Sequence, residues 1–129
     1  MSLKLRPIAV VRNGMREKPD DWDKVRSQLI VRQEYVRGLY KLSHFKHIWV
    51  IFGFHRMRGT ELMVHPRHDP EKPLVGVFAS RSPTRPNKLG LTLVKLVRVK
   101  GRTITVKGLD AFDGSPVFDI KPYEEEIDY

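Results

Sequence analysis

The chain has 129 residues, of which 24 are lysine or arginine and 15 are aspartate or glutamate, for a formal net charge of +9. Apolar residues make up 40% of it, which is typical of a soluble globular domain and excludes a disordered or membrane-spanning chain. The absence of cysteine excludes disulfides, thiolate metal sites and a cysteine nucleophile. We therefore expect a single domain over residues 1–129. Charged residues near the start interrupt any signal peptide, so we expect a cytoplasmic protein.

The charge is unevenly distributed along the chain. Residues 119–129 contain five acids and one lysine and carry −4, which leaves +13 on residues 1–118. A field of this sign raises the local concentration of polyanions and accelerates their association. A lysine-rich surface that only maintains solubility would give the same balance. Composition therefore leaves a nucleic-acid partner and a solubilising surface as alternatives.

Most apolar segments are short and rich in β-branched residues, which indicates strands. In chain order, strands are expected at 5–11, 28–31, 47–54, 61–65, 74–79, 91–99, 103–107 and 117–120. The run at 47–54 is continuously apolar and aromatic, as in a strand that crosses a barrel or is buried on both faces. The segment 74–79 also predicts a buried strand.

Helical periodicity is limited to one segment. Apolar residues recur at helical spacing within 34–42, at Tyr35, Val36, Leu39 and Leu42. Segments rich in glycine, proline and aspartate predict loops at 13–23, 65–73, 80–90 and 109–116. These short strands, with one short helix and long loops, favour a mainly β fold, a small and closed or nearly closed barrel.

The loop 80–90 is stiff and cationic. Pro83 and Pro86 each fix one backbone φ angle and remove one hydrogen-bond donor. Arg81 and Arg85 then project from a preordered frame, and arginine suits carboxylates, phosphates and stacked bases. A crossover between strands with solvated arginines is the alternative interpretation.

A second loop, 110–116, contains Asp113-Gly114, which is first of all a turn signal. An acid with exposed backbone amides beside a pocket would also bind hydroxyl groups such as those of a ribose. No glycine-rich nucleotide loop, P-loop or Gly-X-Ser-X-Gly elbow is present, so neither a Rossmann site nor a serine hydrolase is indicated.

The histidines raise the question of a metal. His55, His65 and His68 with Asp69 allow a metal-dependent hydrolase as an alternative. No His-Glu-X-X-His run supports it, and we expect no metal. His47 begins an apolar strand and is expected to be a core histidine with satisfied hydrogen bonds.

Two long motifs are more specific: GVFASRSPTRPN at 76–87, followed by LGL at 89–91, and LDAFDGSPVFDIKPY at 109–123. With HIWVIF at 47–52 and PIAVV at 7–11, they resemble the signature of the TrmO/TsaA-like family. The resemblance spans about residues 7–123, nearly the whole chain.

The resemblance implies an S-adenosylmethionine-dependent methyltransferase on a single-sheeted β-barrel, unlike the Rossmann-type enzymes. It also implies methylation of N6 of threonylcarbamoyl-adenosine at position 37 of tRNA, in the anticodon loop, by a homodimer with the cofactor near the subunit interface. No membrane partner is expected. A non-catalytic RNA-binding β-barrel is the alternative.

By motif position, the resemblance assigns the cofactor pocket to Phe54, His55, Arg81, Leu91, Asp113, Gly114, Ser115 and Pro116. In this pocket we expect Arg81 to pair with the methionine carboxylate, while Phe54 and Leu91 sandwich the adenine. The turn around Ser115 is expected to bond the adenine edge or the ribose.

The expected catalytic residues are Asn87 and Arg85. Asn87 would accept a hydrogen bond from the adenine N6–H and localise the nitrogen lone pair. The substrate's threonylcarbamoyl carboxylate needs a cation, and Arg85 and Arg56 are alternatives for it. Contacts to tRNA phosphates are expected from Arg56, Arg58, Arg67, Arg85 and Lys88.

Overall fold

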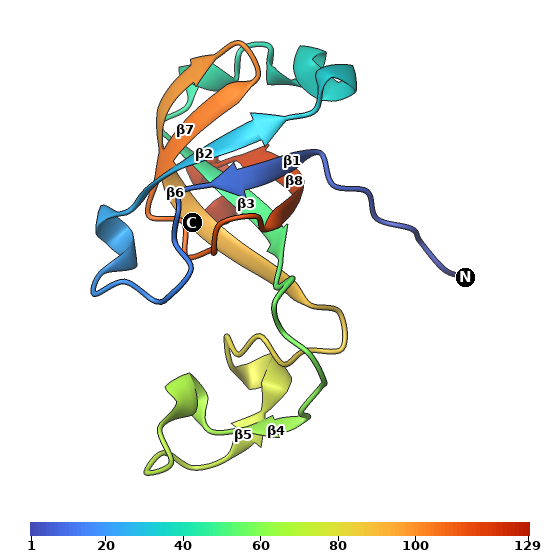
Figure 1. Cartoon of the computed structure of the whole chain (residues 1–129), viewed down its shortest axis with the longest axis vertical. Helices are drawn as coiled ribbons and strands as arrows, with labels where there is room; N and C mark the ends of the chain where they lie inside the picture. The colour runs from blue at the N-terminus through green and yellow to red at the C-terminus, as the bar shows by residue number, and fades with distance from the viewer.

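The computed structural model describes all 129 residues and contains a closed barrel of antiparallel strands (Figure 1). Around the barrel the order is β1 (Ala9–Arg12), β2 (Arg26–Val31), β7 (Thr103–Lys107), β6 (Leu89–Lys100), β3 (His47–Gly53) and β8 (Pro116–Pro122). β8 pairs back with β1, so the barrel has no free edge. The expected mainly β, non-Rossmann barrel is therefore confirmed.

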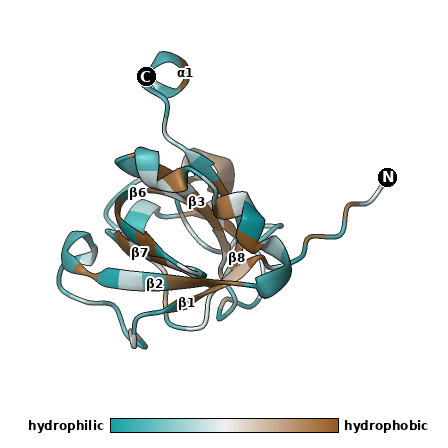
Figure 2. Cartoon of the chain, turned by 90° about the horizontal axis from the view of Figure 1, so that it is seen from above, coloured by the Kyte–Doolittle hydropathy of each residue, from teal (hydrophilic) through white to brown (hydrophobic).

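The barrel interior is filled by alternate residues of its strands. In β3, Ile48, Val50 and Phe52 are buried while the residues between them are more exposed, as the two-residue period of a strand requires. The buried cluster comprises Ala9, Val11, Leu29, Val31, Ile48, Val50, Phe52, Val94, Ile104, Val106, Leu109, Ala111 and Val117. Figure 2 shows the apolar colour along the strands and a polar C-terminal helix, α1 (Glu125–Asp128), standing away from them.

The other helical segments are short 3-10 helices, at Trp22–Lys24, Gln33–Leu39, Leu42–His44, Pro66–His68 and Val77–Ala79. The helix expected at 34–42 is thus replaced by two 3-10 segments. They are separated at Lys41, whose φ of 68° is left-handed and cannot continue a right-handed helix. None of the helical segments has the length and apolar character needed to cross a bilayer.

Two strand predictions were wrong in their extent. The first strand begins at Ala9 rather than residue 5, and Leu5 is 54% exposed. The segment 74–79 is not a buried strand, because only β5 (Val75–Gly76) pairs, with the equally short β4 (Met63–Val64). Val64 and Val77 are buried here, but Leu74 and Phe78 are 53% and 76% exposed. Apolar character alone could not show which of these side chains would be covered.

His47 also differs from expectation. It lies on the exposed face of β3, and its ring packs edge-on against Tyr123, with ring centroids 6.5 Å apart. Because side chains alternate along a strand, the first position of β3 faces outward when Ile48 faces the core.

Residues 54–88, which we call the lobe, form the segment between β3 and β6. Figure 1 shows the lobe, with β4 and β5, extending beyond the barrel end at which β3 stops and β6 starts. The hydrogen bond from Phe54 N to Lys88 O, 2.9 Å long, joins the two ends of the lobe just beyond the barrel.

Candidate functional site

The ends of three strands meet where the lobe joins the barrel. Gly53 ends β3, Leu89 begins β6 and Pro116 begins β8, and Gly53 pairs with Leu89. The residues just outside the barrel are therefore Phe54 and His55 on one side and the 110–116 loop on the other. Segments distant in sequence are held together here by barrel pairing, so their positions depend on the rigid part of the fold.

A cavity of about 450 Å³ opens at this junction. Its aromatic walls are Trp22, Phe52, Phe54 and Phe112. Its charged lining residues are Lys18, Arg56, Arg81 and Asp110. The combination of apolar walls with a few convergent polar groups, in this size range, is typical of small-molecule sites. We call it the aromatic cavity.

Arg81 is fixed at the aromatic cavity by the barrel. Its guanidinium donates a hydrogen bond to the carbonyl oxygen of Leu91, on β6. No acid lies within ion-pair distance of Arg81, since the chain's ion pairs are Arg32–Glu34 and Lys121–Asp119. Arg81 thus presents an uncompensated, partly anchored cation to the cavity, which suits a carboxylate.

His55 and Ser115 form the junction between the lobe and the 110–116 loop. The Ser115 hydroxyl is buried and donates to the carbonyl oxygen of Phe112, at 2.7 Å. Its oxygen lies 3.3 Å from Nδ1 of His55. Burial is the main cause that lowers the pKa of His55, and the adjacent Arg56 lowers it further, while Asp113 raises it. The imidazole is therefore neutral at neutral pH.

Asp113 holds the N-terminal loop in place. Its Oδ1 accepts hydrogen bonds from the backbone N–H groups of Asn13 and Gly14, at 2.9 and 3.1 Å. These two bonds are the main causes that lower the pKa of Asp113; burial opposes them, and Arg12 and Arg16 lower the pKa further. The carboxylate faces a separate hollow with Arg16 and Arg56 and does not line the aromatic cavity.

The remaining residues of the turn 113–116 do not all line the same space. Gly114 has a φ of +86°, which favours glycine, and a Cβ there would lie 3.7 Å from Nε2 of His55. Of the turn, only Ser115 lines the aromatic cavity, while Pro116 lines a neighbouring hollow.

This neighbouring hollow, of about 410 Å³, shares Phe54 and His55 with the aromatic cavity. Its lining includes Asn87 and Lys88 from the end of the lobe. We call it the Asn87 hollow. The Lys88 ammonium donates to the carbonyl oxygen of Arg85 at 2.6 Å and to the Thr60 hydroxyl at 3.1 Å.

Besides Asp113 and Gly114, two more expected site residues, Arg85 and Leu91, lie outside both spaces. Arg85 donates from Nη1 to the carbonyl oxygens of Ser80 and Ser82, at 2.9 and 3.2 Å, and so closes its own loop. Leu91 lies on the outer face of β6, 45% exposed, and contributes to Arg81 only through its carbonyl oxygen.

The sequence reasoning missed several lining residues of the aromatic cavity, among them Lys18, Trp22 and Asp110. Trp22 lies in a segment expected only to be a surface loop, and its ring packs edge-on against Phe112 with centroids 5.6 Å apart. A tryptophan in an otherwise polar loop was the available signal. Asp110 accepts a hydrogen bond from the Thr92 hydroxyl, at 2.5 Å.

The histidines named for a metal site do not form one. No group of three or more histidine, aspartate or glutamate side chains lies together in the chain. His65 Nδ1 is 2.7 Å from the carbonyl oxygen of Lys72, and Asp69 accepts from the backbone N–H of Glu71 at 3.0 Å. His68 instead lines the aromatic cavity.

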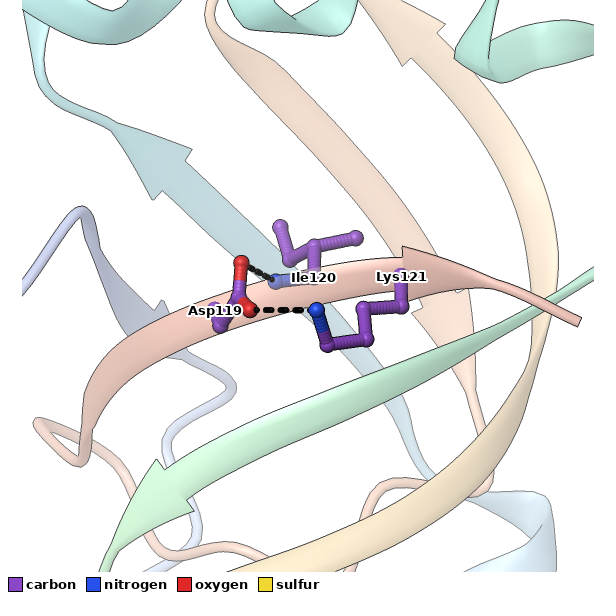
Figure 3. A network of polar contacts seen from close by, with 3 residues as sticks. All are labelled: Asp119, Ile120 and Lys121. Carbon is purple, nitrogen blue, oxygen red and sulfur yellow. Dashed lines mark hydrogen bonds and ion pairs between the residues drawn. The ribbon is translucent and has the colours of Figure 1, made fainter.

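Another hollow, of about 540 Å³, lies at the opposite end of the barrel, beneath the 3-10 segments at 33–44. Its one strand acid, Asp119, is engaged within β8 (Figure 3): Oδ1 accepts from the backbone N–H of Ile120 at 2.9 Å, and Oδ2 lies 3.2 Å from Nζ of Lys121. None of the expected site residues lines this hollow. Those that line a cavity lie at the lobe end of the barrel instead.

Comparisons with known proteins give a consistent result. Residues 9–129 match the family described as the tRNA-methyltransferase O N-terminal domain. A probable S-adenosyl-L-methionine-binding protein of Methanothermobacter thermautotrophicus is 40% identical over 99% of this chain and 95% of its own length. A human tRNA (adenine(37)-N6)-methyltransferase is 38% identical over 91% of this chain, which spans 28% of that protein. The crystal structure of TrmO from Pseudomonas aeruginosa superposes with a TM-score of 0.79 at 29% identity, covering 99% of this chain and 58% of that one.

Proposed function

The chain belongs to the tRNA-methyltransferase O N-terminal domain family, and on this premise we propose that it transfers a methyl group from S-adenosylmethionine to N6 of an adenine in tRNA. The observation that carries the proposal is the aromatic cavity, in which Arg81, Asp110 and Ser115 converge between aromatic walls at the barrel end. The superposition on the solved TrmO chain supports the fold that places this cavity at the barrel end.

The lining of the aromatic cavity fits S-adenosylmethionine. Its volume, about 450 Å³, is within the usual range for a ligand of this size. Aromatic faces such as those of Phe54 and Trp22 attract a sulfonium cation and stack with an adenine. Arg81 would hold the methionine carboxylate, and Asp110 would accept hydrogen bonds from ribose hydroxyls or the amino group. When bound, the cofactor supplies an electrophilic methyl group.

The lobe supplies the surface for RNA. Its cations include Arg56, Arg58, Arg67, Arg85 and Lys88. Neither of the chain's ion pairs involves a lobe residue, so this charge is not neutralised internally. Uncompensated cations next to the cavity favour binding of a phosphate backbone. We expect the anticodon loop to lie against the lobe, with the adenine at position 37 directed to the junction.

For the finer identity of the substrate, threonylcarbamoyl-adenosine, a free cation is needed near the acceptor base. Arg85 is engaged with two carbonyl oxygens of its own loop, and Arg56 donates to the carbonyl oxygen of Arg16 at 2.5 Å and lies 4.2 Å from the Phe112 ring centroid. Lys88 lines the Asn87 hollow, which neither arginine does, and its ammonium has a third proton beyond the two donated to the Arg85 carbonyl and the Thr60 hydroxyl. We therefore assign the carboxylate to Lys88 in preference to either arginine.

The same proposal includes a homodimer. Leu91 and Leu93, on the outer face of β6, are 45% and 37% exposed, and their pairing partners on β3 are Ile51 and Trp49. Cross-strand partners share one face, so these four side chains form an apolar outer strip. An exposed strip of this kind favours contact between two copies. Leu93→Glu should convert a dimer to a monomer in sedimentation analysis.

The test of the function uses undermodified tRNA and labelled S-adenosylmethionine, followed by nucleoside analysis. We expect label on N6 of adenine 37. Arg81→Ala should weaken cofactor binding about 10- to 100-fold in titration calorimetry, because a charge-assisted pair is lost. Arg98→Ala, at a basic position of β6 on the barrel, is the matched control. Cofactor binding without any transfer, or no binding at all, would favour a non-catalytic RNA-binding barrel.

Within this function Asn87 is assigned to the acceptor base. Its amide oxygen would accept a hydrogen bond from N6–H and orient the nitrogen. Asn87→Ala should keep cofactor affinity and lose turnover. Full activity of that variant would contradict this role.

A further inference from the structure

The aromatic cavity and the Asn87 hollow are neighbours that share one partition. Phe54 and His55 line both spaces. If the aromatic cavity holds the methyl donor, a group entering the Asn87 hollow meets the donor only at this partition. The following inference rests on the proposed function and deepens it.

The hydrogen-bond chain at the partition fixes the protonation pattern of His55. The Ser115 hydroxyl has one proton, which it donates to the carbonyl oxygen of Phe112. Its oxygen can then only accept from Nδ1 of His55, at 3.3 Å. The neutral ring therefore carries its proton on Nδ1 and leaves the lone pair on Nε2. On one side Nε2 faces Gly114, where a Cβ would be 3.7 Å away, and the absence of a side chain there keeps it accessible.

We propose that the Asn87 hollow receives the adenine to be methylated and that Nε2 of His55 takes the proton from its N6. The ligand class is a purine nucleoside whose N6 carries an acyl-type substituent. Lys88 would hold that substituent and Asn87 would orient N6–H in the bound nucleoside, while Nε2 of His55, between the nucleoside and the methyl donor, takes the proton as the methyl group is transferred.

Methyl transfer to N6 requires a proton acceptor. A new bond forms between N6 and the methyl carbon, the carbon–sulfur bond breaks with its electron pair retained by sulfur, and the N6 proton moves to Nε2 of His55. The resulting imidazolium releases this proton to water. The amide oxygen of Asn87 can orient N6–H but is too weakly basic to remove the proton, whereas a neutral imidazole is a common general base.

The surroundings of His55 suit this role. The titratable and charged groups around it are Arg56 beside it, Asp113 in the turn, Lys88 across the Asn87 hollow, and Lys18, Arg81, His68 and Asp110 around the aromatic cavity. Burial and Arg56 lower the pKa of His55, so the base form predominates at neutral pH. The imidazolium formed in the reaction is correspondingly ready to lose its proton.

The first test is His55→Gln, which retains hydrogen bonding but cannot take up the proton. We expect kcat to fall about 100- to 10,000-fold, as for loss of a general base, and cofactor affinity to fall much less than kcat, although His55 also lines the aromatic cavity. The acid limb of the kcat–pH profile should coincide with the titration of His55 followed by NMR and should disappear in the variant.

A second readout needs no turnover. The nucleoside threonylcarbamoyl-adenosine, added without cofactor, should shift the Nε2 resonance of His55 in ¹⁵N NMR, while adenosine with its free amino group should shift it less. Ser115→Ala should change the Nδ1–H tautomer population of His55, and it should lower kcat by more than it lowers cofactor affinity. These results would support the inference.

Other outcomes would overturn it. Unchanged kcat in His55→Gln, an unchanged acid limb, or no response of Nε2 to the nucleoside each contradict the base assignment. Equal loss of cofactor affinity and turnover would place His55 in the cofactor site alone. In all of these cases wild-type transfer to adenine 37 still stands, whereas absence of that transfer would contradict the proposed function itself.

Discussion

The barrel and the lobe differ in what orders them: the barrel has a buried apolar core, and the lobe has almost none. The barrel has a continuous cluster of 13 buried apolar residues and every strand is paired on both sides. The lobe, residues 54–88, contributes only Val64, Val77 and Thr84 to the buried set and exposes large apolar side chains such as Phe78. Its order depends instead on prolines and on hydrogen bonds from side chains to its own backbone, such as those of Arg85.

The difference shows how stability and chemistry are divided. The barrel supplies a rigid end from which Phe54, His55 and Ser115 project, and the lobe brings Arg81 and Asn87 to that end. A site assembled this way can bind charged ligands on exposed loops while its geometry depends on a well-packed scaffold. The following predictions test this division, from the largest expected effect to the smallest.

Leu29→Ala should cause the largest loss of stability. Leu29 is fully buried in the barrel, and removal of its side chain leaves a cavity, so the free energy of unfolding should fall by about 2–5 kcal/mol. Leu62→Ala, at a lobe position that is 63% exposed, is the control and should change it by less than about 0.5 kcal/mol. Urea unfolding measures both. Equal losses would show that the lobe is part of the same packed core.

Gly90→Ala should affect both the barrel and the cavity at the lobe. A Cβ at Gly90 would lie 2.6 Å from Cζ of Phe52 and 2.9 Å from Cζ of Phe54, so both rings would have to move. We expect a loss of about 1–3 kcal/mol in unfolding free energy together with weaker cofactor binding, because Phe54 is a cavity wall. Gly76→Ala, where a Cβ meets nothing within 4 Å, is the control. Normal cofactor affinity in Gly90→Ala would argue against Phe54 as a binding surface.

Arg85→Ala should loosen the lobe with little effect on the barrel. It removes the hydrogen bonds to the Ser80 and Ser82 carbonyl oxygens, so amide exchange within residues 80–88 should accelerate. The global free energy of unfolding should change by less than about 1 kcal/mol. The exposed Arg58→Ala is the control for loss of one lobe cation. Unchanged exchange in Arg85→Ala would show that the prolines alone order the loop.

Asp113→Asn should give the smallest effect, visible at acid pH. The amide hydrogen bonds from Asn13 and Gly14 lower the pKa of Asp113, so its contribution to stability is present above the ordinary value of 3.8. That contribution is lost as the pH falls from 3.8 through the lowered pKa. Asp113→Asn should therefore flatten the acid limb of a stability–pH curve, and the exposed Asp20→Asn should leave it unchanged. A persistent limb would assign the acid sensitivity to other carboxylates.

The sequence was sufficient for the barrel but not for the lobe. The strand expected at 103–107 has the observed bounds, because alternation with a glycine hairpin before it is a local signal. The segment 74–79 has the composition of a buried strand, yet its partner is two residues long, and Leu74 and Phe78 remain exposed. Whether an apolar segment finds a covering layer is a tertiary property that its own residues do not encode.

For the candidate site too, the sequence predicted some residues correctly and could not predict the tertiary placement of others. Phe54, His55, Arg81 and Ser115 share the aromatic cavity. Asp113 and Leu91 lie in the expected motifs, but strand alternation and the N-terminal loop direct them elsewhere. Motif position locates a backbone segment, while the direction of each side chain depends on pairing partners up to about 100 residues away, such as Asn13 and Asp113.

The most direct test of the central claim, that the ligand site lies where the lobe meets the barrel, is amide hydrogen exchange with and without S-adenosylmethionine. We expect added protection at residues 54–57, 81–84 and 110–115, with β2 and β7 unchanged. Protection confined to the 33–44 segments at the opposite barrel end, or no change at any residue at saturating cofactor, would contradict the claim.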